Sequence, residues 1–441
     1  MARHRRAPWR TRARRGGFGS AWKVPVNSDG AGRYPRQQTT RAGGTQPGPV
    51  RGREAATAPL GNLASGAYTG IRYRLRRALW ERLTPGAHRV AECGRRPLPG
   101  CGVVLRSSEG GPLHWAGLVT CGSVSACPCC SAKIRAGRAE EIRRGLEVHT
   151  GRGGGALFVT LTLPHTRAQG LVEVWDTLAN ALRRVLSGTH RRVLRERFGV
   201  VGLIRATEVT HGQHGWHPHV HLLVLVDEPW ADLDRVVEFW RWLHLRWARA
   251  VVALGGGEPT LTRGVQVLPC WRDTSAVSRY LAAVSGDVPS ELTRGDRKTA
   301  RLPGHRSPFQ LLADAVEHDD QRAWDLYCEW IASAKGRPVI MWSRGLKDAL
   351  GLWDRSDEEI AEEHDHHQVV AHVTRECWRA MTSAGCTVEA AEVATILGLD
   401  SLAGVLGMWG VRAWLDRRGQ GPPVLRAIRG AAPTTGLAGS C

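Results

Sequence analysis

The sequence has no run of about twenty apolar residues, the length that a membrane-spanning helix requires, so no membrane partner is expected. Its N-terminus is basic but lacks the apolar core of a secretory signal, which predicts a cytoplasmic protein. The GxxxxGK loop followed by Ser or Thr does not occur, so no P-loop motif supplies ATP-driven work. Internal repeats are absent as well, and tyrosine is scarce, with 5 residues in 441.

Positive charge is abundant, with a formal net charge of +20 carried mostly by arginine. Guanidinium groups match phosphate oxygens, so a basic surface favours nucleic acid or an anionic membrane as the partner. Genomic codon bias is the alternative explanation, because the chain is rich in Arg, Gly and Ala and poor in Lys. The charge balance nevertheless favours binding to nucleic acid.

The 11 cysteines favour thiol or metal chemistry over disulfides. Cys127 and Cys130 have the spacing of a zinc knuckle, in which one short turn brings two thiolates to one ion, and Cys121 lies just upstream. A basic helix is expected to follow, and we expect its Arg135 and Arg138 to contact DNA. A redox pair, or a zinc ion with no role in DNA binding, remains an alternative.

The length and composition predict two or three domains. Residues 1–65 are rich in Arg, Gly and Pro without hydrophobic period, which predicts a disordered basic arm. Residues 70–150 hold the cysteine-rich zinc module and its basic helix. Residues 151–350 form the main domain, and residues 356–441 are expected to be a helical C-terminal region.

The main domain shows alternating strand and helix patterns. Strands are expected at 157–163, 200–210, 217–226 and 264–268, and amphipathic helices at 171–185 and 233–247. This order predicts an α+β fold, with a central antiparallel sheet flanked by helices.

Histidines alternate along the strand at 217–226, and alternate side chains of a strand share one face. His219 and His221 are therefore expected side by side, where two imidazoles chelate a divalent metal. If Gly212 to Gly215 form the turn of a hairpin, Glu208 lies opposite His219 and completes a His-His-Glu site. His217 has the same parity and is the alternative ligand.

Several ordered motifs resemble one family. The strand Phe158–Thr162, followed by the pair His219 and His221, resembles the HUH endonuclease superfamily, whose palm is a split βαβ-like sheet. Within it, the chain is similar to the rolling-circle plasmid replication initiators of actinobacteria. The segments typical of that group are Arg205–Gly212, Gly215–His219, Ser307–Leu312 and Trp342–Leu346. The resemblance spans roughly residues 85 to 365.

The resemblance implies a site-specific single-strand DNA endonuclease and strand transferase, in which Mg²⁺ or Mn²⁺ assists a tyrosine nucleophile. Tyr280, on an expected helix after the last strand, matches the catalytic tyrosine, whereas Tyr327 lies on an apolar helix face. The implied products are a 5′-phosphotyrosine and a 3′-OH that primes rolling-circle replication. The implied partners are single-stranded or hairpin origin DNA, a host helicase and a single-strand-binding protein.

The resemblance also implies that Cys93, the counterpart of an upstream cysteine, is the fourth zinc ligand, with Cys129 and Cys101 as alternates. The chain departs from the family at Ala283, where a lysine is usual. Ala276 likewise replaces a glutamate that activates water in some relatives, and the nearest acid is Asp273. The cations that could substitute for the lysine are Arg279, Arg294 and Lys298. A relaxase, a transposase and a catalytically degenerate zinc-dependent DNA-binding regulator are therefore alternative functions.

Overall fold

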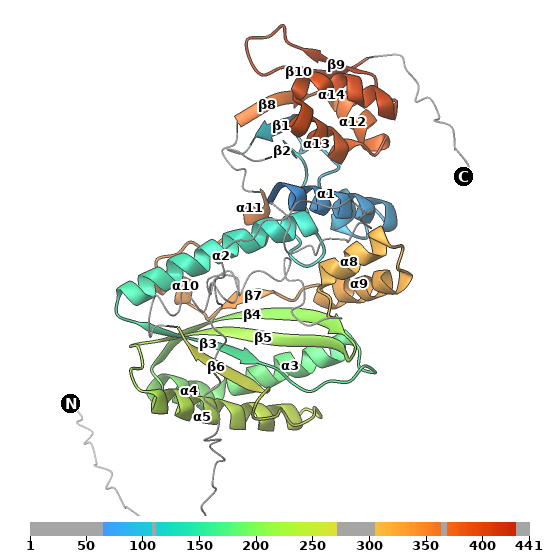
Figure 1. The fold of residues 1–441 in the computed structure, drawn as a ribbon. Helices are drawn as coiled ribbons and strands as arrows, with labels where there is room; N and C mark the ends of the chain where they lie inside the picture. The colour runs from blue at the N-terminus through green and yellow to red at the C-terminus, as the bar shows by residue number, and fades with distance from the viewer. Residues whose placement is uncertain (1–64, 108–111, 271–304, 363–367, 429–441) are drawn as a thin grey trace, which may run out of the picture. The chain divides into compact units, whose positions relative to one another are not determined.

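The computed structural model describes residues 65–107, 112–270, 305–362 and 368–428 (Figure 1). The basic arm at residues 1–64 lies outside the described residues. So does the segment 271–304, with the expected nucleophile Tyr280 and the other residues assigned there: Asp273, Ala276, Arg279, Ala283, Arg294 and Lys298. Among the residues that are described, no helix has the length and apolar character to cross a membrane.

The main domain is built on a five-stranded sheet in the order β6-β3-β5-β4-β7, and every neighbouring pair is antiparallel. Its strands are β3 (Gly155–Leu161), β4 (Val200–Gly212), β5 (Gly215–Val226), β6 (Val265–Pro269) and β7 (Ile340–Trp342). The predicted α+β class and antiparallel sheet are confirmed, and each expected strand is present within a few residues of its predicted bounds.

The hairpin of β4 and β5 has the register predicted from the sequence. Gly212 pairs with Gly215, and Glu208 lies opposite His219. Gly215 has a φ of 85°, a conformation that disfavours a side chain, and a Cβ there would lie 3.0 Å from the Cα of Arg167. The turn therefore requires glycine at this position, and it fixes the pairing of every residue along both strands.

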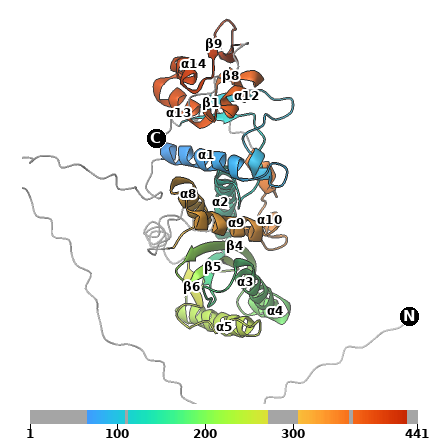
Figure 2. The same ribbon diagram turned by 90° about the vertical axis from the view of Figure 1, so that its right-hand side faces the viewer.

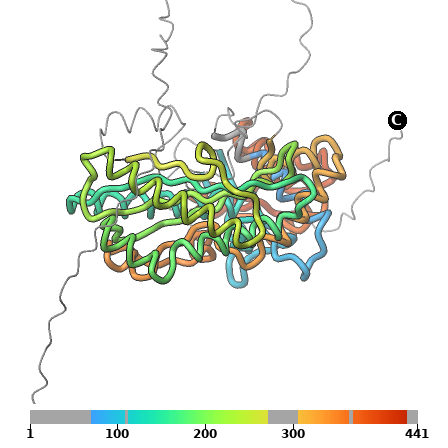
Figure 3. Tube along the Cα trace, turned by 90° about the horizontal axis from the view of Figure 1, so that it is seen from below, coloured from blue at the N-terminus to red at the C-terminus, as the bar shows by residue number. Residues whose placement is uncertain are grey.

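Helices cover both faces of this sheet (Figures 1 and 2). Three of them, α3 (Leu171–Val185), α4 (Gly188–Glu196) and α5 (Leu233–Val252), lie on one side, which faces the viewer in Figure 3. Leu222 and Val224 of β5 pack against them, whereas Leu223 and Leu225 share a cluster with Ile142 of α2 (Pro128–Gly151) on the opposite face. Successive residues of β5 therefore point to opposite faces of the sheet, and each face carries its own apolar layer.

The cysteine loop packs against α8 (Pro308–Glu317), α9 (Gln321–Ala334) and α1 (Ser65–Arg82), with the short η2 (Arg89–Glu92) beside it. The motif Ser307–Leu312 begins α8 through a capping box, in which Ser307 and Gln310 each accept from the other's backbone N–H. Tyr327 of α9 is fully buried, and its hydroxyl donates to the carbonyl of Ala126 at 2.6 Å. Helix α9 thus braces the loop that carries the cysteines.

A second sheet, in the order β2-β1-β8-β10-β9, joins the cysteine module to the end of the described chain. Its strands are β1 (Val103–Ser107), β2 (Leu113–Ala116), β8 (Gln368–Val373), β9 (Ala413–Asp416) and β10 (Val424–Ala427). The accompanying helices are α12 (Arg375–Ser383), α13 (Thr387–Leu397), α14 (Leu399–Leu406) and η3 (Gly407–Trp409). Between the two sheets along the chain come α10 (Leu346–Ala349) and α11 (Asp357–Glu362).

The C-terminal region contains the helices expected for it, but it also contributes β8, β9 and β10, three strands that the prediction did not include. Its strands have only four to six residues, and β8 pairs with β1, which lies more than 250 residues earlier in the chain. Such short strands give little periodic signal, and their partner cannot be read from local sequence. Trp378 adds a further link, because its indole donates to the carbonyl of Arg95.

Candidate metal centres and the family of the chain

Two groups of side chains within the described residues have the composition of metal sites. The first lies on the central sheet and consists of Glu208, His219 and His221, with their ligand atoms all within 4.8 Å of one another. A carboxylate oxygen of Glu208 lies 3.2 Å from Nε2 of His219 and 3.3 Å from Nε2 of His221. The predicted convergence of these three residues is present in the structure.

The ring of His221 is held from two sides. Thr160, its partner across the β3–β5 pairing, has its Oγ1 3.1 Å from His221 Nδ1, and Phe158 stacks on the imidazole at 5.1 Å. When Nδ1 carries the proton and donates to Thr160, Nε2 presents a lone pair towards Glu208, which is the form that binds a metal. Thr160 therefore positions His221 as an outer partner does in a metal site.

His219 provides the test of fit. Its Nδ1 is buried, and no hydrogen-bond partner for it occurs among the described residues. A buried ring nitrogen without a partner is costly, and an ion held jointly by Nε2 of His219 and by Glu208 would offset that cost. Two imidazoles and a carboxylate suit a divalent first-row metal and leave coordination positions for water and substrate. The donor set fits a divalent metal ion with open coordination positions.

His217, the alternative ligand, lies outside this group. Its Nδ1 is 2.8 Å from Nε2 of His165, in the loop after β3. The pKa of His217 is lowered to about 3, mainly by burial and in part by the neighbouring His219 and His165. His217 is thus held neutral in a histidine pair beside the candidate centre.

The second group is the predicted set Cys93, Cys121, Cys127 and Cys130, all buried. The sulfur of Cys93 lies 3.6 Å from those of Cys127 and Cys130, and Cys121 lies 3.7 Å from Cys130. Ligands about 2.3 Å from a tetrahedral zinc ion are about 3.8 Å apart, whereas a disulfide measures about 2.05 Å. The separations match a zinc site and exclude disulfides within this set.

The two alternates for the fourth ligand are not part of the group. Cys101 is exposed, and the thiol of Cys129 donates to the carbonyl of Arg72 at 3.5 Å. The pKa of Cys93 lies well below its ordinary value, because the neighbouring thiols of the set hydrogen-bond to its sulfur. The lowered pKa favours the thiolate, which is the form of cysteine that binds zinc.

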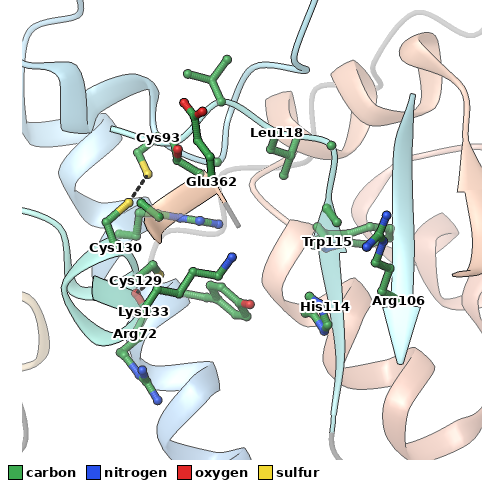
Figure 4. Close-up of a pocket in the computed structure, with 18 residues that line it drawn as sticks. Arg72, Cys93, Arg106, His114, Trp115, Leu118, Cys129, Cys130, Lys133 and Glu362 are labelled. Atoms are coloured by element: carbon green, nitrogen blue, oxygen red, sulfur yellow. Dashed lines mark hydrogen bonds between the residues drawn. The ribbon is translucent and has the colours of Figure 1, made fainter. Parts of the chain in front are cut away.

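A pocket of about 170 Å³ adjoins this cluster and is lined by Arg72, Arg76, Arg106 and Lys133, with Glu362 as its acid (Figure 4). Burial lowers the pKa of Arg76, but the sulfurs of Cys129, Cys93 and Cys127 outweigh it, and the pKa is raised. Zinc bound to four thiolates carries a formal double negative charge. The positive lining would offset that charge if zinc is bound, so we assign this pocket no ligand.

The structure contradicts the expectation that Arg135 and Arg138 contact DNA. Arg135 is buried, and its Nε donates to Ser131. Arg138 exposes 13% of its side chain, and its guanidinium pairs with Glu141 and Asp357. Burying an arginine requires satisfying its donors, and Arg138 does so in part through Asp357, which connects α2 to α11. The sequence pattern showed a basic helix but not which of its faces is buried.

Sequence reasoning missed two residues beside the histidines. The strand pattern could have revealed Thr160, because it lies on the polar face of β3 and the adjacent strand determines its partner. No such signal existed for His165, which lies in a loop that only the tertiary fold brings to His217.

Taken together, the antiparallel sheet with its histidine and carboxylate group, and the separate four-cysteine module, define an α+β protein with two groups of side chains that could hold metal ions. A family model described as replication protein matches residues 116–253, which include the hairpin and three of the four cysteines. Protein rep of Streptomyces lividans is 32% identical over 367 aligned residues, covering 67% of this chain and 79% of that protein. A neomycin resistance protein of Streptomyces cyanogenus is 35% identical over 153 residues, covering 29% of this chain and 35% of that protein. No solved structure matches the chain.

The chain belongs to the replication protein family of actinobacterial plasmids, which confirms the resemblance seen in its motifs. Origin DNA is the partner that membership in this family implies.

Proposed function

We propose that this protein nicks one strand of a plasmid origin and so initiates rolling-circle replication, as an HUH-type endonuclease. The observation that carries the proposal is the meeting of Glu208, His219 and His221 on one face of the central sheet. These residues would hold Mg²⁺ or Mn²⁺, which withdraws charge from a bound phosphodiester. Zn²⁺ in the four-cysteine site would have a structural role, because a closed tetrathiolate offers no open position.

The proposed nucleophile is Tyr280, in the segment 271–304 outside the described residues. Its phenolic oxygen would bond to the scissile phosphorus while the bond to the 3′ oxygen breaks. The phenol proton leaves to solvent or a base, and the departing 3′ oxygen takes up a proton. The products are a 5′-phosphotyrosine and a 3′-OH primer. Arg279 and Lys298, in the same segment, are proposed contacts to the bound DNA strand.

Tyr327 is a poor alternative nucleophile. It is fully buried, its hydroxyl donates to a backbone carbonyl, and burial raises its pKa well above the ordinary value. Both features oppose formation of the phenolate, and a buried phenol offers no access to a DNA strand. Tyr327 therefore serves as the matched control for Tyr280.

The test is formation of a covalent adduct. The full chain is mixed with Mn²⁺ and a labelled single strand from its own replicon, and the adduct is separated under denaturing conditions. We expect the adduct in the wild type and in Tyr327→Phe, which loses one hydrogen bond worth about 1 kcal/mol. It should disappear in Tyr280→Phe, and an undiminished adduct in that variant would exclude Tyr280 as the nucleophile.

A second candidate is a non-catalytic, zinc-dependent DNA-binding regulator, favoured by Ala283 in place of the lysine usual in the family. Absence of any adduct, together with sequence-specific binding of origin DNA, would favour it. A relaxase or transposase would also form the adduct, but a polymerase would not extend the nicked 3′ end at an origin. A host helicase and a single-strand-binding protein are proposed partners of the replication reaction.

A further inference from the structure

A groove of about 580 Å³ lies on the other face of the central sheet from the candidate catalytic metal. Arg205 of β4 lines it, and its neighbours in the sheet are Leu222 and Met341. Glu208 is three residues further along the same regular strand, and residues an odd number apart point to opposite faces. The groove is therefore separate from the hairpin site.

Four arginines line this groove. Arg191 and Arg195 come from α4, Arg205 from β4, and Arg344 from the turn after β7. The one carboxylate in the lining is Asp227, whose Oδ1 already accepts from the backbone N–H of Glu228. The groove therefore has a strong excess of positive charge.

Three of these arginines are exposed, and within the described part of the chain Arg191, Arg195 and Arg344 form no ion pair. Arg205 is half-buried; burial lowers its pKa, and repulsion from Arg183 lowers it further. Both effects disfavour the charged form of Arg205 and would be relieved by an anion in the groove. The arrangement differs from the exposed arginines of α2, where Arg143 pairs with Glu140 on its own helix.

The motif Trp342–Leu346 supports a role for Arg344. Ser343 fixes the segment to β4, because its Oγ accepts from the N–H of Leu203 and donates to the carbonyl of the same residue. Gly345 turns the chain with a φ of 75°, and Leu346 is buried. Its neighbours in the motif thus have structural roles, whereas Arg344 is held exposed at the groove.

We propose that this arginine groove, formed by Arg191, Arg195, Arg205 and Arg344, binds the backbone phosphates of duplex DNA while the opposite face handles the strand to be cut. Guanidinium groups form paired hydrogen bonds to phosphate oxygens. The cations are spread over three elements along an open groove, which suits a polymer of repeated charges better than a single small anion. The inference shares its partner, DNA, with the proposed function but does not require nicking.

The test uses the full chain with Arg191→Gln, Arg195→Gln and Arg344→Gln combined. Binding of a short mixed-sequence duplex is measured across a KCl series. Each phosphate contact adds about 0.9 to the slope of log K against log salt, so the slope should fall in magnitude by about 2 to 3. A matched control replaces the exposed Arg375, Arg379 and Arg412, which also lack ion pairs among the described residues, and should leave the slope nearly unchanged.

Equal losses of slope in the two triple variants would mean that total charge, not the groove, binds DNA, and would overturn the proposal. No loss in the groove triple would overturn it as well and would leave an acidic protein partner as the rival occupant. If the triple variant misfolds, the single variant Arg344→Gln still tests the proposal, with an expected slope change of about 1. The adduct assay separates the two proposals. If the protein forms no adduct but its salt slope still depends on the groove arginines, the nicking mechanism is contradicted and the groove proposal stands.

Discussion

The two candidate metal centres are built in opposite ways. Glu208, His219 and His221 come from adjacent strands of one hairpin, and two of the three are only partly buried. The four cysteines come from a 3₁₀ turn, a loop and the start of α2, and all are buried. An open site exchanges water and substrate, whereas a closed site does not.

The two centres also differ in how far the fold around them depends on a bound metal ion. The backbone pairing of the hairpin does not depend on an ion, so a metal bound at that site would contribute chemistry more than stability. Four buried thiols have little reason to meet without an ion, because burial of unpaired polar groups is unfavourable. Removing metal from the two sites should therefore have different consequences.

The largest expected effect is loss of the cysteine site. Cys127→Ser removes a proposed zinc ligand but not the N-cap of α2, because the serine hydroxyl can accept from the N–H of Cys130 as the sulfur does. We expect bound zinc to fall from one per chain to none and the Tm to drop by more than 10 °C, as structural zinc contributes several kcal/mol. Metal analysis and calorimetry measure both. Cys101→Ser, at an exposed thiol, is the control and should change neither.

The next effect concerns the hairpin. His221→Ala should reduce adduct formation by about 100-fold or more, because one of three ligands is lost, while the Tm changes by only a few degrees. His214→Ala, in the exposed turn of the same hairpin, is the control and should keep full activity. A drop in Tm as large as that of Cys127→Ser would contradict the distinction between an open and a structural site.

A smaller effect is expected at Thr160, which holds His221 through its Nδ1. Thr160→Val keeps the shape but removes the hydroxyl. It should lower the affinity for Mn²⁺ by about 10-fold or more, so that adduct formation requires a higher Mn²⁺ concentration. Excess Mn²⁺ should restore the rate, and Thr160→Ser should behave as wild type. A lower maximal rate at saturating Mn²⁺ would show that Thr160 acts on the reaction rather than on metal binding.

The hairpin was the more predictable of the two centres. Its alternating histidines and flanking glycines determine both face and register, so the meeting of Glu208 with His219 followed from the period of a strand. Cys93 could be added to the zinc set only through family resemblance, because it is distant in sequence and the chain offers 11 cysteines. The second sheet was missed for the same reason, since β1 and β8 are partners that no local pattern connects.

The smallest expected effect tests the electrostatics of the hairpin without touching a proposed ligand. The pKa of His211 is lowered to about 4, mainly by burial and in part by Arg306 and Arg322. The unfolded chain then binds more protons than the folded one between pH 6.5 and about 4. The contribution of His211 to the free energy of unfolding is fully present above pH 6.5. It is lost as the pH falls towards 4, by up to about 1 kcal/mol per pH unit. His211→Gln should flatten this part of the pH profile in urea unfolding, and an unchanged slope would show that His211 is protonated in the folded state.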